Sequence, residues 1–539
     1  MRPNDSLKRA LTATLLAACL AVTVVAANLP LPPRDEVNSI TARDLKKHLS
    51  FLASDELGGR YTLSQGNRIA ARYLAAQLES YGYRGGARDG SFFQKVPLSY
   101  RGVDAAASHV SFTTSGQTSE FKYGDDFLSA PPVRGDFSGD LVFVGYGISS
   151  PKNKYDDYAG LDVKGKIVVL ISEDTPEALK SVALSDEERG ERAAAAHGAV
   201  GAIGILPPPT IAEWQQMKAY LSRADQLGLP PHPTADGKPF PIIAAGPPLI
   251  SAIAKAMGKE SSYLQPAGKA ASPMPIPAQA GVRVMAIAKD APAAQNVVGI
   301  LEGADAKLKD EYVVFSAHYD HLKTTDNGEV YNGADDDGSG TVSVLDIAQA
   351  FTVGPRPQRS ILIVFHTGEE LGLFGSEYNT DYEPVIPLAK LVADFNIDMI
   401  GRSKPAGDTD PLDRELSDKD TLYVIGSDKL SSELHKLSEA TNAETAHLKF
   451  DYRMNAESHP ERLYYRSDHY NYAKHGIPVI FYFTGLHRDY HRTTDDVGKI
   501  DFETMERIAR MIFATGWRVA NLDHRLVVDK AAAASAPAK

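Results

Sequence analysis

The sequence predicts an α/β protein with a mostly parallel, mixed sheet flanked by helices, and a second, mainly β module inserted into it. From Val282 onward, short apolar runs alternate with stretches of helical spacing, a pattern typical of βαβ units. From about 130 to 280 the chain has short β-like runs and many prolines instead. At 539 residues the chain is long enough for two or three domains.

The first 27 residues have the features of a secretory signal. Lys8 and Arg9 precede an apolar stretch from Ala10 to Ala27 that ends in small residues. We therefore predict a signal peptide over residues 1–27 and an exported protein, periplasmic or secreted. A single-pass membrane anchor and lipoprotein processing at Cys19 are the alternatives. Cys19 is the only cysteine, so the mature chain would have no disulfide and no thiolate ligand.

The overall composition is that of a globular protein, with 43% hydrophobic and 23% charged residues. The formal net charge of −12 argues against nucleic acid and anionic membranes as partners. We expect no nucleic-acid partner and no membrane contact beyond the signal segment. The sequence has no signature of an oligomeric state.

Changes in the sequence pattern divide the rest of the chain into four segments. Residues 28–129 are predicted to begin the main domain, with two helices between Thr41 and Tyr83 that have leucines at helical spacing. Residues 130–280 would form the inserted module, residues 281–525 the core of the main domain, and residues 526–539 a disordered tail. The inserted module is expected to contain three strands and one helix, at Leu141–Tyr146, Lys166–Ile171, Gly201–Leu206 and Asp186–His197.

The core of the main domain contains five apolar runs that predict buried strands. Two amphipathic stretches, Thr341–Phe351 and Asp501–Leu522, predict helices that cover them. The five runs are Val297–Leu301, Tyr312–Ala317, Ser360–Phe365, Leu391–Phe395 and Pro478–Phe483.

Acidic and imidazole side chains directly follow three of these strands and gather near a fourth. Ligand sites in open α/β sheets lie beyond the carboxyl ends of the strands, so we expect these groups to meet at one edge. They occur in His318-Tyr-Asp320, Gly333-Ala-Asp335-Asp336-Asp337-Gly-Ser-Gly340, Glu369-Glu370, Asn396-Ile-Asp398 and Tyr490-His491.

Each group has a chemical interpretation and a plainer one. His318 and Asp320 leave the same face of a strand, so His318 fits a metal ligand whose other ring nitrogen is held by Asp320. A simple His–Asp hydrogen bond is the alternative. The three consecutive Asp residues around Asp336 repel one another unless a cation is present. A solvated acidic turn is the alternative there.

The last groups are interpreted in the same way. One carboxylate of the Glu369-Glu370 pair can bind a metal while the other faces the reacting water. Asp398 lies in an apolar run, where a carboxylate is rarely left unpaired; backbone N–H groups could equally bind it. His487 precedes His491 by four residues, but the stretch has no helical periodicity and no zincin motif. We expect His487 at the surface or supporting the site.

These motifs, in this order, resemble the dinuclear-zinc aminopeptidase family that also includes glutamate carboxypeptidase II. The resemblance covers roughly Val297 to Leu522, and more weakly the turn Asp55-Glu-Leu-Gly-Gly-Arg60. The fold it implies is the zinc exopeptidase fold. The segments Tyr158–Val169 and Ala193–Ile205 resemble the protease-associated domain that many members insert.

The resemblance implies a role for each site residue and two Zn²⁺ per chain. Asp336 would bridge the two ions, His318 and Asp398 would complete one site, and Glu370 and His491 the other. Glu369 would be the general base and Tyr490 would stabilise the oxyanion, with Asp320 supporting His318. Family members often have a cis peptide after the bridging residue, here between Asp336 and Asp337.

The expected function is that of an exported zinc exopeptidase, an aminopeptidase that removes N-terminal residues from peptides with a free N-terminus. A carboxypeptidase or related amidohydrolase on the same scaffold is the main alternative. A binding protein without catalysis is the other, and the complete ligand set together with Glu369 argues against it. Side-chain preference cannot be read from the sequence, because the walls of the substrate pocket come from loops.

Overall fold

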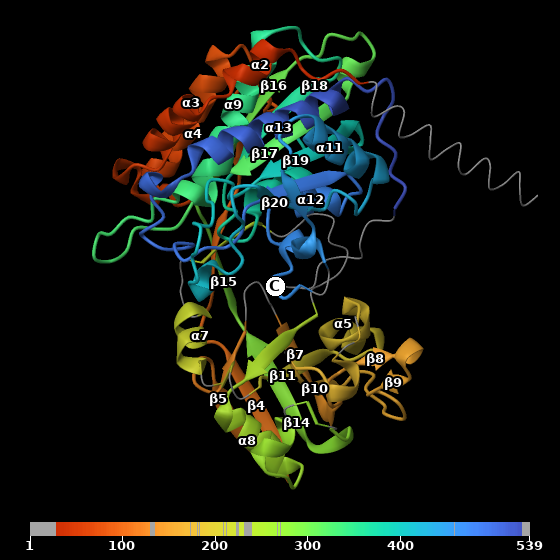
Figure 1. Cartoon of the computed structure of the whole chain (residues 1–539). Helices are drawn as coiled ribbons and strands as arrows, with labels where there is room; N and C mark the ends of the chain where they lie inside the picture. Colours follow the sequence, from red (N-terminus) through yellow and green to blue (C-terminus); the bar gives the residue numbers. More distant parts are fainter. Residues whose placement is uncertain are drawn as a thin grey trace, which may run out of the picture. The chain divides into compact units, whose positions relative to one another are not determined.

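Figure 1 shows the computed structural model of the chain, which forms two compact units. The described residues 29–97 and 292–530 form the first unit, and residues 98–291 form the second. The predicted signal segment 1–27 lies outside the described residues. The structure describes residues 29–530 except 130–134, 173, 181, 183, 208–209, 212, 222–225, 231–239, 267, 270 and 457–458.

The first unit is built on a nine-stranded sheet in the order β1-β16-β18-β17-β19-β22-β20-β21, with β2 also paired to β16. The four central strands are parallel to one another, and all their residues are buried. This confirms the predicted mixed, mostly parallel sheet. The central strands are β17 (Tyr312–His318), β18 (Ser360–His366), β19 (Leu391–Ile397) and β22 (Val479–Phe483).

The outer strands run antiparallel to their inner neighbours at both sides of this centre, except β21, which is parallel to β20. On one side β16 pairs with β18, and on the other β20 pairs with β22. The outer strands are β16 (Ala294–Leu301), β1 (Arg84–Gly85), β2 (Phe93–Val96), β20 (Thr421–Ile425) and β21 (Lys449–Asp451).

One face of the sheet carries the apolar core of the first unit. Phe315 of β17 packs against Phe351 of α9 and Phe395 of β19, with ring centroids 5.5 and 5.2 Å apart. Helix α13 (Phe502–Ala520) lies next to α9 (Gly340–Val353) over the central strands (Figure 1). Both helices agree with the predicted stretches to within two residues.

The opposite face of the same strands is polar, because side chains of a strand alternate between faces. Ser316 is hydrogen-bonded to Asp394 at 2.8 Å and to Asn396 at 3.0 Å. His366 lies 3.3 Å from the hydroxyl of Tyr472, which belongs to the short helix α12 (His469–Ala473). The polar face leads directly to the carboxyl ends where the acidic residues lie.

The N-terminal helices complete the first unit. Thr41 and Ser64 cap α3 (Ala42–Leu52) and α4 (Gln65–Ser80) by accepting backbone N–H bonds from Asp44 and Asn67. The predicted turn Asp55–Arg60 between them is a tight 3₁₀ segment. The other helices of this unit are α2 (Arg34–Ser39), α10 (Phe374–Glu377) and α11 (Ser432–Glu444).

The second unit has a sheet and core of its own, as the change of composition predicts. Eight strands pair in the order β5-β4-β14-β7-β10-β11-β13-β6, and β12, β3 and β15 form a separate small sheet. The main strands are β4 (His109–Thr114), β5 (Gln117–Lys122), β6 (Phe127–Leu128), β7 (Gly135–Phe143), β10 (Ile167–Ile171), β11 (Gly201–Ile205), β13 (Ile242–Ala245) and β14 (Met274–Val284). The small sheet contains β3 (Ser99–Val103), β12 (Gln226–Gly228) and β15 (Ala286–Asp290).

The helices of the second unit are α5 (Gly190–Ala196), α7 (Trp214–Leu221) and α8 (Pro247–Ala256). The predicted helix Asp186–His197 is shorter than expected, because Gly190 has φ +60° and separates α5 from a short 3₁₀ turn before it. Two of the three predicted strands correspond to β10 and β11, each to within one residue at its ends. The third, Leu141–Tyr146, overlaps only the last part of β7, which begins at Gly135 and ends at Phe143.

The boundaries of the second unit differ from those expected at 130 and 280. It begins at Leu98 and ends at Ala291, because β4 is hydrogen-bonded to β14 and β15 to β3. Strand pairing over such distances in sequence leaves no local composition signal.

The predicted disordered tail, 526–539, also needs correction at its start. Leu526 is buried in the core of the first unit, and Asp529 accepts a hydrogen bond from the backbone of Ser432. Residues 531–539 lie outside the described residues.

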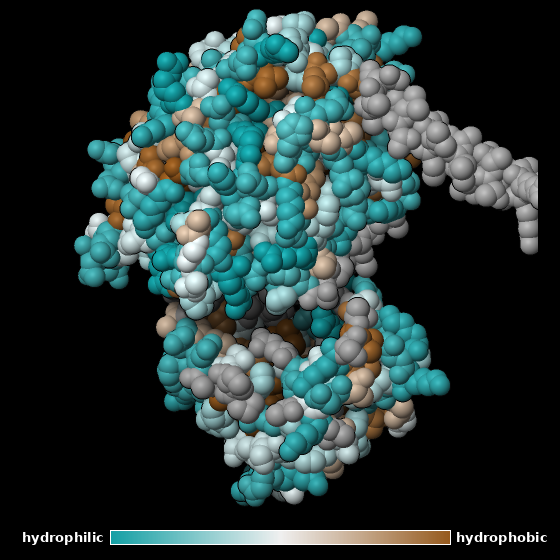
Figure 2. Space-filling model, viewed as in Figure 1, coloured by the Kyte–Doolittle hydropathy of each residue, from teal (hydrophilic) through white to brown (hydrophobic). Residues whose placement is uncertain are grey.

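Hydrophilic residues cover most of the face shown in Figure 2, with apolar residues scattered among them. Single exposed apolar residues such as Leu412 are ordinary on a protein surface. Within the described residues, none of the helices combines the length and the apolar character that crossing a bilayer demands.

The packing of α13 on β17 gives a first prediction, for Gly516→Ala. Alanine favours a helix over glycine by up to about 1 kcal/mol. However, a Cβ at 516 would lie 2.2 Å from Cζ of Phe315, and overpacking costs about 1–3 kcal/mol. We expect the clash to dominate, lowering the melting temperature of the first unit by roughly 2–6 °C in calorimetry.

Gly498→Ala is the matched control, because a Cβ there meets no atom within 4 Å. Its effect should remain within about 0.5 kcal/mol. An increase in melting temperature for Gly516→Ala would mean that Phe315 can withdraw from its aromatic neighbours.

Candidate metal centre

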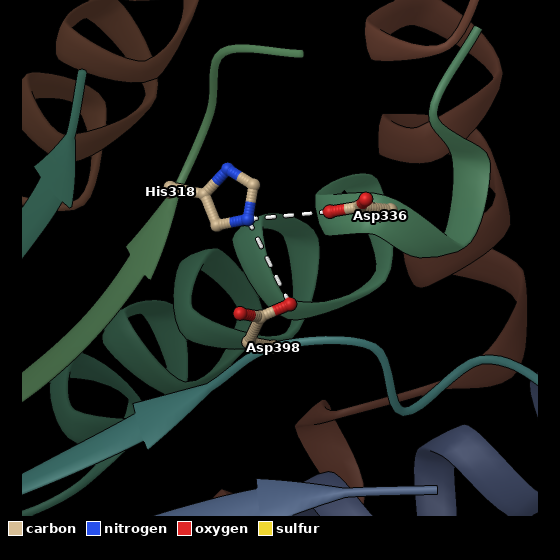
Figure 3. Close-up of side chains that lie close together, drawn as sticks. All are labelled: His318, Asp336 and Asp398. Carbon is tan, nitrogen blue, oxygen red and sulfur yellow. Dashed lines mark ion pairs between the residues drawn. The ribbon is translucent and has the colours of Figure 1, made fainter. Parts of the chain in front are cut away.

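His318 ends β17 and lies at the centre of the acidic groups. Its Nε2 is 3.3 Å from Oδ1 of Asp336 and 3.7 Å from Oδ1 of Asp398. Figure 3 shows these three side chains pointing toward one another from the strand end of β17, the turn before α9 and the loop after β19. Together they could hold a metal ion.

Asp336 lies in the turn before α9, and its two carboxylate oxygens face different imidazoles. Oδ1 faces His318, whereas Oδ2 is 3.1 Å from Nε2 of His491. The neighbouring peptide, between Asp336 and Asp337, is cis, as the family resemblance implies. A carboxylate in this position can serve two cations, one at each oxygen.

Asp398 follows β19 and has its second oxygen occupied. Oδ2 accepts a hydrogen bond of 2.8 Å from the hydroxyl of Ser467. Oδ1 is thereby left facing His318. Ser467 directly precedes Asp468, which the sequence suggests as a residue of a pocket loop that could support the metal ligands.

The second group lies on the other side of Asp336. Nε2 of His491 is 3.1 Å from Oε2 of Glu370 and 3.1 Å from Oδ2 of Asp336. Hydrogen bonds to Asp336 and Glu370 outweigh burial and raise the pKa of the imidazole of His491 to about 10. Such a cluster of acceptors around one imidazole has the donor chemistry of a divalent metal site.

His321 is a member of this group that the sequence reasoning missed. Its side chain is fully buried, and its Nδ1 lies 2.6 Å from Oε1 of Glu370 and 3.7 Å from Oδ2 of Asp336. His321, Asp336 and Glu370 could therefore also hold a metal ion. The available signal was its spacing, three residues after His318 in the same loop.

Glu369 lies close to both groups, but its distance to His318 is longer than the contacts within either group. Its Oε2 is 3.8 Å from Nε2 of His318, and 12% of its side chain is exposed. Burial, reinforced by the charges of Glu370 and Asp398, raises the pKa of Glu369 well above its ordinary value. This partly open position suits a group that meets substrate.

Asp320 is buried beside His318, but its carboxylate does not hold the imidazole as expected. Nδ1 of His318 lies 3.2 Å from the backbone carbonyl oxygen of Asp320 and 3.9 Å from its carboxylate. The carboxylate instead accepts bonds from the hydroxyl of Thr62 and the backbone N–H of Glu369. Burial raises the pKa of Asp320 to about 6. Asp320 thus supports the loop of Glu369.

Tyr490 stacks on His491, with ring centroids 3.9 Å apart. Burial, followed by the charges of Asp336 and Glu370, raises the pKa of its phenol well above the ordinary value, so the hydroxyl keeps its proton. It lines a pocket over the metal groups whose apolar wall is formed by Met399, Leu463, Phe481, Phe483 and Leu486, with Arg466 at its side.

Asp335 and Asp337, the two neighbours of Asp336, accept hydrogen bonds from backbone N–H groups of the surrounding segments. Asp337 accepts N–H bonds from His318, Gly340 and Met399, which joins the end of β17, the start of α9 and the segment after Asp398. Asp335 accepts the N–H of Gly401 and lies 3.2 Å from Nε2 of His487.

His487, expected at the surface or in support of the site, is buried and supports it. Asp495 fixes the same turn from another loop, because its carboxylate accepts the backbone N–H groups of Asp335 and Asp336. Nothing in the local sequence pattern had indicated this contact.

Arg60 supplies a buried positive charge next to this acidic cluster. Its guanidinium donates to the carbonyl oxygens of Leu52, Tyr319, Asn332 and Gly333 at 2.6–3.0 Å. It therefore links the loop after His318 to the turn before Asp335. Burial lowers the pKa of Arg60, and the nearby Asp320, Asp336, Asp337 and Asp495 oppose that shift.

The distances fit a pair of divalent ions. Two ligands of one tetrahedral zinc ion, with bonds of about 2.0–2.1 Å, lie about 3.3 Å apart. The contacts of His318 and His491 with their carboxylates span 3.1 to 3.7 Å. The donors are imidazoles and carboxylates, which suit zinc.

Parts of the chain are similar to known proteins. A sequence model described as "Peptidase family M28" matches residues 296–516. The chain is 35% identical over 109 residues to "Aminopeptidase YwaD" of Bacillus subtilis, covering 20% of this chain and 22% of that protein. It is 27% identical over 250 residues to a "Probable zinc metalloprotease" of Pyrenophora tritici-repentis, covering 42% of this chain and 57% of that protein.

The chain thus spans less than two thirds of either relative in these matches. Among solved structures, the aminopeptidase from Aneurinibacillus sp. strain AM-1 is similar over 92% of this chain and 97% of that chain, with 19% identity and a TM-score of 0.48.

The role of Arg60 can be tested by Arg60→Met. This change removes the guanidinium donor from four buried carbonyl groups, of which, among the described residues, only that of Gly333 keeps another donor, the N–H of Gly338. It also removes the cation beside the carboxylates. Breaking a buried charge arrangement costs about 3–5 kcal/mol, so we expect the metal-free protein to melt several degrees lower. Thermal unfolding with and without zinc measures the effect, which should be smaller with zinc present.

Arg43→Met is the control, since the side chain of Arg43 is 88% exposed and its ion pair with Asp44 is long, at 3.8 Å. Exposed pairs contribute about 0–1 kcal/mol. Equal melting temperatures for both variants would contradict the role given to Arg60.

Proposed function

Because the chain belongs to peptidase family M28, we propose that it is an exported, zinc-dependent aminopeptidase with two zinc ions per chain. The observation that carries the proposal is the placement of Asp336, whose two oxygens face His318 on one side and His491 on the other. One ion would be held by His318, Asp336 and Asp398, and the other by Asp336, Glu370 and His491. The substrates would be peptides with a free N-terminus.

When bound, the zinc ions would polarise the scissile carbonyl and lower the pKa of the attacking water. The carboxylate of Glu369 takes the proton from that water and passes it to the leaving amine. Support for this role comes from its position 3.8 Å from His318 with partial exposure to the pocket. The Tyr490 hydroxyl, in the same pocket, donates to the developing oxyanion.

The free amine of the substrate would be bound by the carboxylates around the second group, which restricts cleavage to the first residue of the peptide. The apolar wall of Met399, Leu463, Phe481, Phe483 and Leu486 would receive the adjacent side chain. Export rests on the N-terminal segment 1–27 of the sequence, with lipoprotein anchoring at Cys19 as the alternative.

A carboxypeptidase is the second candidate, and Arg466 favours it. A guanidinium at the pocket can bind the carboxylate of a peptide C-terminus. However, Arg466 is already paired with Glu461 at 2.6 Å, which weakens this reading. The two candidates predict opposite effects of blocking either end of a peptide.

The function is tested with aminoacyl reporter substrates and short peptides. We expect hydrolysis of substrates with a free amine and none of their N-acetylated forms, whereas C-terminal amidation should have little effect. A chelator should abolish turnover, and added zinc should restore it. Cleavage of acetylated peptides that amidation blocks would instead establish the carboxypeptidase.

The general base is tested by Glu369→Gln, which keeps the shape of the side chain and removes its basicity. We expect kcat to fall by about 10²–10⁴-fold while metal analysis still finds the wild-type zinc content. Glu329→Gln, at an exposed loop position, is the control and should leave kcat unchanged. Near-normal turnover by Glu369→Gln would assign the base to another group.

A further inference from the structure

His321 has no role in the proposed mechanism, yet it is buried within the second group of metal-site residues. It lies in the loop after β17, three positions beyond His318. Its Nδ1 is 2.6 Å from Oε1 of Glu370. Among the described residues, the Glu370 carboxylate has two such side-chain contacts, this one with His321 and the one with His491.

The contact distances separate two roles for His321, metal ligand and hydrogen-bond donor. Two ligands of one tetrahedral zinc lie about 3.3 Å apart, and His491 is 3.1 Å from both Glu370 and Asp336. The 2.6 Å contact of His321 is too short for two ligands sharing a metal. A contact of 2.6 Å instead corresponds to a short hydrogen bond to an ionised carboxylate.

The direction of this bond follows from the carboxylate. An ionised carboxylate can only accept, so the proton must be on Nδ1 of His321. The bond occupies Oε1 of Glu370 and leaves Oε2, the oxygen that faces His491, as the one available to a cation. His321 thereby selects which oxygen of Glu370 is used.

The backbone fixes the imidazole ring in this orientation. Gly333 has φ +55°, and a Cβ there would lie 2.5 Å from Cδ2 of His321. The ring therefore packs directly on the backbone of the turn that leads to Asp336. A glycine is required at 333 both for the positive φ and for this contact.

The first group of residues has the same arrangement with a different donor. Ser467 donates to Oδ2 of Asp398 and leaves Oδ1 facing His318. In both groups one oxygen of the non-bridging carboxylate is held by a protein donor and the other is directed at the imidazole ligand. The recurrence supports a positioning role for His321.

We propose that His321 is a positioning residue of the second metal site, which donates from Nδ1 to Glu370 and fixes that carboxylate in a monodentate orientation. The inference rests on the proposed zinc centre. Donors that orient metal-binding carboxylates typically contribute about 10–100-fold to metal affinity.

Three substitutions at His321 test the proposal in the full-length protein. The amide nitrogen of asparagine occupies nearly the place of Nδ1, whereas that of glutamine occupies the place of Nε2. We expect His321→Ala and His321→Gln to weaken one of the two zinc equivalents by about 10–100-fold, measured by competition with a chelating dye. His321→Asn should retain most of that affinity.

Cobalt substitution provides a readout that does not depend on activity. If His321 only donates a hydrogen bond, the visible spectrum of the Co²⁺-loaded His321→Asn protein should match that of the wild type. Loss of a zinc equivalent in His321→Asn, with a changed spectrum, would make His321 a direct ligand and overturn the proposal. Unchanged affinities in His321→Ala would also overturn it.

His48→Ala is the matched control for removing a buried imidazole. His48 is 2% exposed and is bonded to the hydroxyl of Tyr73, in helices away from the metal groups. It should lower the melting temperature while leaving both zinc affinities unchanged. Wild-type protein that binds no zinc would refute the metal centre itself, whereas a two-zinc wild type with an unaffected His321→Ala would refute only the role of His321.

Discussion

Repulsion among buried carboxylates around His318 is the constraint that the surrounding structure has to satisfy. Like charges this close interact strongly where water is excluded. The structure balances them with backbone N–H groups, which bond Asp337 and Asp495, and with the buried guanidinium of Arg60. The buried acidic residues of the cluster are Asp320, Asp335, Asp336, Asp337, Asp398 and Asp495. Divalent cations would neutralise the charge that remains.

The parallel sheet brings these charges together and keeps their spacing. His318 is level with His366, and Ser316 with Asn396, so the carboxyl ends of three strands meet at one edge. Phe315 and its aromatic neighbours anchor the other face of the same strands. Because the apolar and polar faces alternate along one strand, the packing that stabilises the sheet also fixes the direction of the site residues.

Much of this could be predicted from the sequence, because it depends on local pattern. Buried apolar runs followed at once by acidic residues indicate both the strands and the residues at their ends. The hydrogen-bond partners could not be predicted in this way. The carboxylate of Asp320 turns to Thr62 and Glu369, not to His318, and the second unit begins at Leu98 through pairing with strands far along the chain. Both depend on contacts between distant segments.

The contacts of the two oxygens of each carboxylate distinguish Asp336, Glu370 and Asp398 more clearly than their positions in the sequence do. Asp398 and Glu370 each have one oxygen held by a protein donor, Ser467 or His321. Asp336 has both oxygens directed at imidazoles. A terminal ligand needs only one free oxygen, whereas a bridging ligand needs two. Within the proposed two-zinc centre, this hydrogen-bond pattern would make Asp336 the bridging carboxylate and Asp398 and Glu370 the terminal ones.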